Sequence, residues 1–217
     1  MPTDPPLLRV RNLRRAFGQV TVLDGVELDV AAGEAVALVG RNGAGKSTLL
    51  RCVTGADRPS DGTVELAGRR LDERDPDVRR DLAVVMDDLD FFPDLSVVEH
   101  LDLFARAHGL AGDEAEAVVD RVLADVGLVP QSAQLPATLS SGQRRRLALA
   151  SAFVRPRRLL VLDEPEQRLD TAGVTWLIER LVQEKGDGLG VLLASHDPAL
   201  VDAVADRVVS LDRTGAE

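Results

Sequence analysis

Residues 34–48 read EAVALVGRNGAGKST, and this stretch joins a run of apolar residues to a glycine-rich segment that contains a lysine. The near-continuous apolar pattern of residues 34–40 is typical of a strand buried in a parallel sheet. Glycines follow, and a helix is expected to begin at about Gly45. A strand, a glycine-rich loop and a helix in this order predict an α/β fold with a phosphate-binding loop at the end of the strand.

The loop fits the pattern of Gly, four residues and then Gly-Lys-Ser, which cradles phosphate groups. Glycine lets backbone amides turn toward phosphate oxygens, and the positive end of the following helix adds to the attraction. In this interpretation Lys46, which is one of only two lysines in the chain, neutralises the β and γ phosphates, and Ser47 binds Mg²⁺. The residues predicted to bind nucleotide are Gly40, Arg41, Asn42, Gly43, Ala44, Gly45, Lys46, Ser47 and Thr48.

Composition limits the classes of protein that the chain can represent. With 217 residues, of which 45% are hydrophobic, it is long enough for one sizeable α/β core. The formal net charge of −10 argues against a general electrostatic grip on nucleic acid, and we expect no nucleic-acid partner. The single cysteine, Cys52, excludes an internal disulfide and is expected to be buried.

The opening residues MPTDPPLLRVRN lack a signal-peptide pattern, and no apolar run approaches the roughly 20 residues that span a bilayer. We therefore expect a cytoplasmic protein.

The apolar pattern along the chain alternates between strands and helices. Between residues 96 and 126 it has a helical period, in two helices that each start with a capping residue and end at glycine. Further helices are expected over residues 172–185 and 198–205. The predicted strands are 7–13, 20–30, 34–40, a short strand within 59–68, 82–87, and the segments LLVLD, GVLLAS and DRVVSL. This alternation predicts a parallel sheet that is covered on both faces.

A second buried strand, LLVLD, ends in carboxylates at Asp163 and Glu164. Carboxylates at the end of a buried strand are costly unless a cation compensates their charge. A magnesium-nucleotide at residues 40–48 would supply that cation, so we expect Asp163 to hold the ion from a neighbouring strand, usually through water. Glu164 is then free to polarise the attacking water as a general base.

The segment LSSGQ, residues 139–143, lies just ahead of RRRLALASAFVRPRRLLVLDEP and is similar to the signature LSGGQ. With these motifs the chain resembles the ATP-binding subunits of ABC transporters over nearly its whole length. The resemblance implies one ABC ATP-binding domain over residues 1–217, with a P-loop NTPase core, a mostly parallel sheet, an N-terminal antiparallel β subdomain and a helical subdomain inserted at about 88–155. It also implies ATP and Mg²⁺ as cofactors, and a head-to-tail dimer, expected to be a homodimer. The signature residues that would contact the ATP of the other subunit are Leu139, Ser140, Ser141, Gly142 and Gln143.

Three further positions match the pattern of that family. Phe17 matches the aromatic residue that stacks on adenine, although an isolated phenylalanine is more often a core residue. His196, in LLASHDP, matches the switch histidine that contacts the γ-phosphate. Asp170 closes QRLD, which is similar to the segment that crosses the dimer interface.

The chain departs from the family pattern at one residue and in one three-residue segment. Asp87 stands where the family has a glutamine that binds Mg²⁺ and couples the helical insert to the core. A carboxylate there could still hold the metal, or it could repel Glu164 and slow turnover. Glu166, Gln167 and Arg168 replace small residues and put the geometry of the dimer interface in question. The arginines that follow the signature, residues 144–146, are expected on a solvated helix face or beside acidic neighbours.

The leading interpretation is an ATPase subunit that powers a separate membrane permease and is held through it at the inner face of the cell membrane. The segment FFPDLSVVEHLDLFARAHGL resembles efflux ATPases, so we expect export. One alternative is a non-transport ABC ATPase acting on ribosomes or DNA. Another is a nucleotide-sensing switch that binds ATP and barely hydrolyses it, which the presence of Asp87 would explain.

Overall fold

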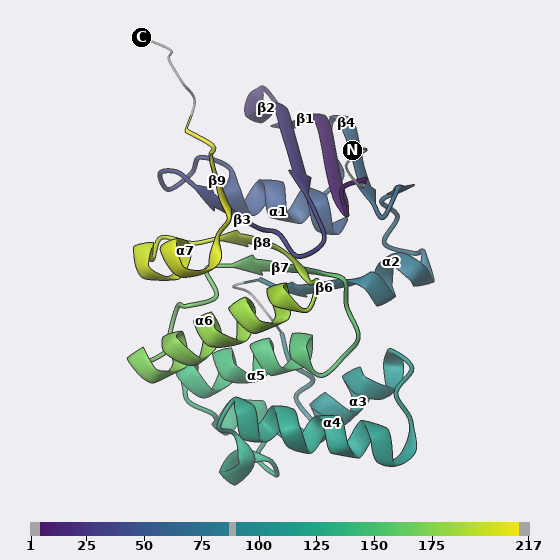
Figure 1. The fold of residues 1–217 in the computed structure, drawn as a ribbon, viewed down its shortest axis with the longest axis vertical. Coiled ribbons are helices and arrows are strands. Elements are labelled where there is room, and N and C mark those ends of the chain that lie inside the picture. The colour runs from purple at the N-terminus through teal and green to yellow at the C-terminus, as the bar shows by residue number, and fades with distance from the viewer. Residues whose placement is uncertain (1–4, 87–89, 213–217) are drawn as a thin grey trace.

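The molecule is built from two sheets with helices around them (Figure 1). The computed structural model describes residues 5–86 and 90–212. Among these residues a five-stranded parallel sheet has the order β6-β7-β8-β3-β9, and a four-stranded antiparallel sheet has the order β2-β1-β4-β5. The strands are β1 (Leu8–Phe17), β2 (Val20–Val30), β3 (Ala35–Val39), β4 (Asp61–Leu66), β5 (Arg69–Arg70), β6 (Leu82–Val85), β7 (Leu159–Asp163), β8 (Gly190–Ala194) and β9 (Arg207–Ser210). The predicted α/β fold, with a parallel sheet and an N-terminal antiparallel sheet, is confirmed.

The helices cover both faces of the parallel sheet. They are α1 (Lys46–Thr54), α2 (Pro76–Asp81), α3 (Val97–Ala107), α4 (Gly112–Asp125), α5 (Ser141–Phe153), α6 (Thr171–Gly186) and α7 (Pro198–Val204), with the short 3-10 helices η1 (Val129–Gln131) and η2 (Pro136–Thr138). In Figure 1, α1 and the antiparallel sheet lie above the parallel sheet, and α5 and α6 lie below it. The parallel sheet is therefore the middle layer of the molecule.

Burial on both faces explains the continuous apolar sequence of the parallel strands. Successive side chains of a strand point to opposite faces. In β3, Ala35 and Ala37 join the apolar cluster that contains residues of α3 to α6, whereas Val36 and Leu38 join the cluster that contains α1 and the antiparallel sheet. A strand between two such clusters gains stability from both sets of side chains. Cys52 is buried in the second cluster, as expected.

The starts of α3 and α4 differ from each other. Ser96 accepts a hydrogen bond from the N–H of Glu99, and the Glu99 carboxylate accepts one from the N–H of Ser96, so α3 begins with a capping box. The expectation that α4 also starts with a capping residue is wrong, since Ala111 precedes its first residue, Gly112. Asp113 lies inside the first turn instead, where a negative charge interacts favourably with the helix dipole.

The helical segment predicted at about 88–155 contains α3, α4 and α5, which lie between β6 and β7 in the sequence. Side chains of α4 such as Val119 belong to the same apolar cluster as Leu193 of β8. These helices and the lower face of the sheet thus share one continuous core. Whether they form a separate subdomain stays a prediction.

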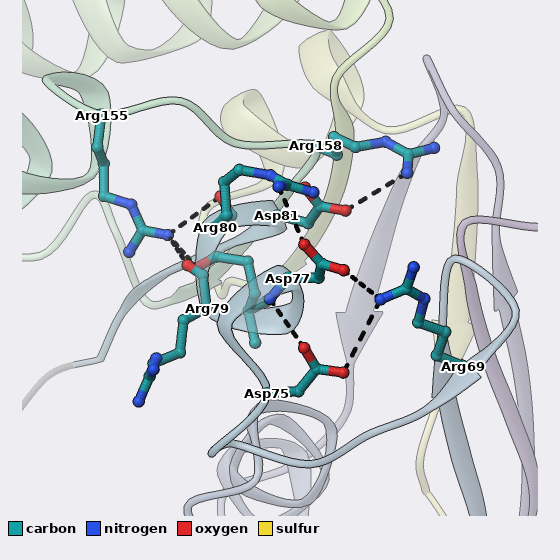
Figure 2. Close-up of polar contacts among 9 residues, drawn as sticks. Arg69, Asp75, Asp77, Arg79, Arg80, Asp81, Arg155 and Arg158 are labelled. Carbon is teal, nitrogen blue, oxygen red and sulfur yellow. Dashed lines mark hydrogen bonds and ion pairs between the residues drawn. The ribbon is translucent and has the colours of Figure 1, made fainter. Parts of the chain in front are cut away.

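An ion-pair network surrounds α2, which the apolar pattern does not predict because Val78 is its one buried apolar residue. Asp77 contacts the guanidinium groups of Arg69 and Arg80, as Figure 2 shows. At the end of α2, the Asp81 carboxylate lies 3.4 Å from Nη1 of Arg158, and the Asp81 carbonyl accepts from the N–H of the same residue at 2.8 Å. The network therefore fastens the start of β6 to the loop between α5 and β7.

Arg155 adds a second connection to the same helix (Figure 2). Its guanidinium donates to the backbone carbonyls of Arg79 and Arg80 at the end of α2, and to that of Leu82 at 2.6 Å. Burial lowers the pKa of Arg155 to about 10. The group nevertheless stays charged at neutral pH, and a positive charge at the C-terminal end of a helix is stabilising.

Candidate nucleotide-binding and hydrolysis site

The order of the parallel strands decides which side chains meet at the site. Strand β8 pairs with β3 on one side and with β7 on the other. The expectation that Asp163 lies on a strand next to the phosphate-binding loop is therefore wrong, because β8 separates β7 from β3. His196 follows β8, so it lies between the loop after β3 and the carboxylates after β7. Ligand sites in such sheets form outside the carboxyl ends of the strands, where all three segments end.

The loop after β3 has the backbone that phosphate binding requires. Gly45 has a φ of 100°, and a Cβ added there would lie 2.8 Å from Leu23 and 3.1 Å from Val22. A larger residue would be strained in its backbone and would also collide with its neighbours. Within the described chain, no side chain caps the start of α1, which leaves the first amides of that helix available to an anion.

Lys46 is buried at the start of α1 and points back across the loop. Its Nζ donates to the carbonyl oxygen of Gly40 at 2.8 Å and lies 3.0 Å from Nε2 of His196. A buried ammonium needs acceptors or a negative partner. The position predicted for neutralising phosphates therefore holds a lysine whose charge is directed at the loop.

Glu164 and His196 are in direct contact. Nε2 of His196 lies 3.3 Å from Oε1 of Glu164, and the backbone N–H of His196 donates to Oε2 of Glu164 at 3.2 Å. Unprotonated, Nε2 can accept from Lys46; protonated, it can donate to Glu164, so the ring serves one partner at a time. Burial raises the pKa of Glu164 to about 7, and the negative charge of Glu166 acts in the same direction.

The residues predicted to hold Mg²⁺ supply oxygen ligands of the type that this ion prefers. Ser47 offers a hydroxyl in the first turn of α1, and the carboxylate of Asp163 is buried at the end of β7. Asp87 lies outside the described residues. Over the ranges 5–86 and 90–212, no group of three or more histidine, cysteine, aspartate or glutamate side chains could hold a metal by itself. The donor set fits an ion that completes its shell with water and phosphate oxygens.

Phe17 ends β1 and is half exposed, at 47%. The guanidinium of Arg15 lies 4.2 Å from the centre of its ring. A large exposed aromatic ring with a cation on one face can still stack on a flat ligand with the other face. This geometry agrees with the predicted contact to adenine, which stays a prediction.

The signature segment forms the start of α5. Ser140 accepts from the N–H of Gln143 at 3.2 Å, and the Gln143 side chain accepts from the N–H of Ser140 at 2.9 Å. A Cβ added to Gly142 would lie 2.9 Å from the carbonyl oxygen of Arg168. The signature of this chain thus packs against its own segment that leads to Asp170.

Asp170 links the segment after β7, which it ends, to α5 and α6. Its Oδ1 accepts from the N–H of Gly173 at 2.9 Å, which caps α6, and from Nη2 of Arg146 at 2.7 Å. Arg146 therefore meets an acidic neighbour, as expected for the arginines after the signature. Arg144 is exposed, which also agrees with that expectation.

Arg145 contradicts the expectation of a solvated face, since it is only 3% exposed. Its guanidinium donates to the backbone carbonyls of four residues, Asp163 at 2.7 Å, Glu164 at 2.5 Å, Pro165 at 3.2 Å and Met86 at 3.0 Å. The helical period could have identified it, because Arg145, Ala148, Leu149 and Ala152 lie on one stripe and all are buried.

Glu166 is the second residue whose position the sequence does not predict. Its Oε1 accepts from Oγ of Ser195 at 2.5 Å and from the N–H of His196 at 3.3 Å. The side chain is thus turned toward the loop after β8. The sequence gives one indication that Glu166 has a special position, which is that it replaces a small residue of the family pattern.

A phosphate-binding loop at a helix start, together with carboxylates at the end of a parallel strand, defines a P-loop nucleotide-binding domain. A family model described as ABC transporter matches residues 23–167. The chain belongs to the ABC transporter family, as an ATPase domain of that family.

The chain is similar to curated proteins whose names describe ATP-binding proteins of import systems. The spermidine/putrescine import ATP-binding protein PotA of Pseudomonas aeruginosa is 36% identical over 214 residues, covering 98% of this chain and 59% of that protein. The aliphatic sulfonates import ATP-binding protein SsuB of Pseudomonas entomophila is 40% identical over 208 residues, covering 94% of this chain and 73% of that protein. The chain thus spans about three fifths of the length of PotA.

Solved structures share the fold. The structure of an ATP-binding subunit of an ABC transporter superposes with a TM-score of 0.88 at 33% identity, over 94% of this chain and 85% of that chain. A dimeric ATP-binding cassette in a post-hydrolysis state, bound to ADP and phosphate, has a TM-score of 0.85 at 23% identity, over 94% and 93%. Among the described helices, none has both the length and the apolar composition needed to cross a membrane.

Proposed function

We propose that this chain is the ATP-hydrolysing subunit of a membrane ABC transporter. The observation that carries the proposal is the contact chain from Lys46 through His196 to Glu164, with distances of 3.0 Å and 3.3 Å at Nε2 of the histidine. An ammonium for phosphate, a histidine and a carboxylate base are thereby gathered at the phosphate-binding loop. This set of groups suits phosphoryl transfer to water.

In this proposal each group has one role. The amides at the start of α1 and the ammonium of Lys46 bind the phosphates, and Phe17 stacks on the adenine. Glu164 accepts the proton of the attacking water, a task for which a pKa of about 7 is well matched near neutral pH. His196 contacts the γ-phosphate and orients Glu164. Mg²⁺, held by Ser47 and Asp163, would neutralise phosphate charge when bound.

A head-to-tail dimer is the second part of the proposal. Leu49 of α1 belongs to the apolar cluster on one face of the parallel sheet, and Leu147 of α5 belongs to the cluster on the other face. The phosphate-binding loop and the signature therefore start helices on opposite faces of the same sheet. This separation supports a model in which residues 139–143 contact the ATP bound by a second copy, and the dimeric state of one similar cassette agrees with it.

The transporter partner is inferred from the relatives. The names of PotA and SsuB describe ATP-binding proteins of import systems, which supports a membrane permease as partner and a location at the inner face of the membrane. These names give no support to export, the direction that residues 91–110 indicate. Direction is therefore left to transport assays in vesicles of known orientation.

The decisive experiment measures ATP binding and hydrolysis by the purified chain with Mg²⁺. We expect ATP binding and a slow turnover that Glu164→Gln reduces at least about a hundredfold. Binding without any turnover in the wild type would support the nucleotide-sensing switch instead. Absence of binding would overturn the proposal.

A further inference from the structure

The carboxylate of Glu166 lies among the groups that would handle the γ-phosphate. Its Oε1 accepts two hydrogen bonds, from Oγ of Ser195 at 2.5 Å and from the N–H of His196 at 3.3 Å. Ser195 is buried and follows directly after β8. One carboxylate oxygen thus joins the segment after β7 to the turn after β8.

The hydrogen bond between Ser195 and Oε1 of Glu166 continues into a chain of hydrogen bonds through the turn after β8. Oγ of Ser195 also accepts from the N–H of Asp197 at 2.9 Å, and Asp197 in turn caps α7 by accepting from the N–H of Ala199 at 2.8 Å. The hydroxyl can accept from Asp197 and donate to Glu166 at once, because it has one proton and two lone pairs. Glu166 therefore fixes the hydroxyl proton, and through it the backbone of residues 195–197.

The N–H of His196 is shared between two carboxylates. It lies 3.2 Å from Oε2 of Glu164 and 3.3 Å from Oε1 of Glu166. The two carboxyl groups also interact with each other, since the charge of Glu166 and a hydrogen bond between the two side chains add to burial in raising the pKa of Glu164. Such an arrangement is costly, and costly arrangements at a site often serve its function.

We propose that Glu166 is a positioning residue that holds the turn 195–197 so that His196 faces both Lys46 and Glu164. The inference builds on the proposed function, because it assigns a task in ATP hydrolysis to a residue that need not touch the nucleotide. It also explains the departure from small residues at this position: the side chain points into the site. A hydrogen-bond acceptor at Oε1, and not the negative charge, is what the turn requires.

The test compares Glu166→Ala, which removes the acceptor, with Glu166→Gln, which keeps an oxygen at Oε1. Ser195→Ala removes the hydroxyl from the other side of the bond, and Glu179→Ala removes an exposed glutamate of α6 as a matched control. Two kinds of measurement are made on each purified protein. They are the hydrogen exchange of peptides covering residues 194–200 without nucleotide, and the kcat and KM for ATP with Mg²⁺.

We expect exchange in Glu166→Ala and Ser195→Ala to be at least about threefold faster than in the wild type, because the turn opens locally. We expect kcat of Glu166→Ala to fall about tenfold with KM changed less than about threefold, since phosphate binding does not use this side chain. Glu166→Gln should restore the exchange rate and kcat to wild-type values, and Glu179→Ala should leave exchange, kcat and KM unchanged.

Wild-type exchange and kcat in Glu166→Ala would overturn the inference, as would equal defects in Glu166→Ala and Glu166→Gln. If Glu166→Ala does not fold, Ser195→Ala and Glu166→Gln still decide the matter by the same criteria. A wild type without ATPase activity would refute the proposed function, while the exchange data would still test whether Glu166 holds the turn.

Discussion

Nη2 of Arg145 donates to the carbonyl oxygen of Asp163 at 2.7 Å, so the signature helix is hydrogen-bonded to the end of the strand that carries the acidic pair. The same guanidinium reaches the carbonyl of Met86, the residue directly after β6. A guanidinium has five N–H donors in a fixed plane, which lets one side chain satisfy several carbonyls at once. Arg145 thus connects three segments that are far apart in the sequence.

Arg145→Ala is expected to lower the free energy of unfolding by about 3 kcal/mol, because buried carbonyls lose a charged donor and a cavity forms. The free energy of unfolding of Arg145→Lys should lie between those of the wild type and Arg145→Ala, since an ammonium cannot reach all four carbonyl acceptors. Urea denaturation measures the differences. The neighbouring residue Arg144 is exposed and offers a control. The free energy of unfolding of Arg144→Ala should stay within about 0.5 kcal/mol of the wild type. Equal stability of the two alanine variants would contradict the burial of Arg145.

Lys46→Ala is expected to weaken Mg-ATP binding at least about tenfold, because the phosphates lose their main cationic contact. Calorimetry measures the affinity. The chain contains one other lysine, Lys185, whose Nζ donates to Asp206 and to the carbonyl of Val204. Lys185→Ala is therefore a matched control and should keep the wild-type affinity. Unchanged binding by the Lys46 variant would refute the phosphate-loop assignment.

Glu164→Gln is expected to bind ATP and to hydrolyse it at least about a hundredfold more slowly, which is the usual effect of losing a general base. Because the bound ATP persists, the variant should accumulate as a dimer, which light scattering after gel filtration detects. Glu179→Gln, on the exposed side of α6, provides the control. A monomeric Glu164 variant with normal turnover would contradict both the base and the dimer.

The pH dependence of stability follows from the same carboxyl group. The folded-state pKa of Glu164 is raised to about 7 from an ordinary value of 4.5, mainly by burial. The folded protein therefore holds this proton more tightly than the unfolded chain, and the stability it contributes is lost as pH rises from about 4.5 through 7. Glutamine carries no such proton.

Without nucleotide and Mg²⁺, the melting temperature of Glu164→Gln relative to the wild type should therefore increase between pH 5 and pH 8. Thermal unfolding followed by circular dichroism at both pH values gives this difference. A difference that stays constant, or that decreases with pH, would show that the carboxyl group is not held in its protonated form by the fold.

Local sequence determined the elements and the motifs of this protein. Apolar residues in β3 and β7 are continuous because both faces of those strands are buried, and that pattern is visible without a structure. The loop from Gly40 to Ser47 is likewise recognisable, because phosphate binding requires glycine and lysine at set spacing. Short-range periodicity and motif spacing carry this information.

Tertiary structure alone decided how those elements meet. No local pattern states that β8 inserts between β3 and β7, yet this order brings His196 between Lys46 and Glu164. The burial of Arg145 and the inward turn of Glu166 are also decided by packing, because each depends on partners at least 18 residues away along the chain. Helical periodicity can place Arg145 on a buried stripe, but only the folded arrangement of carbonyls, hydroxyls and amides shows which groups compensate a charged side chain that is held inside.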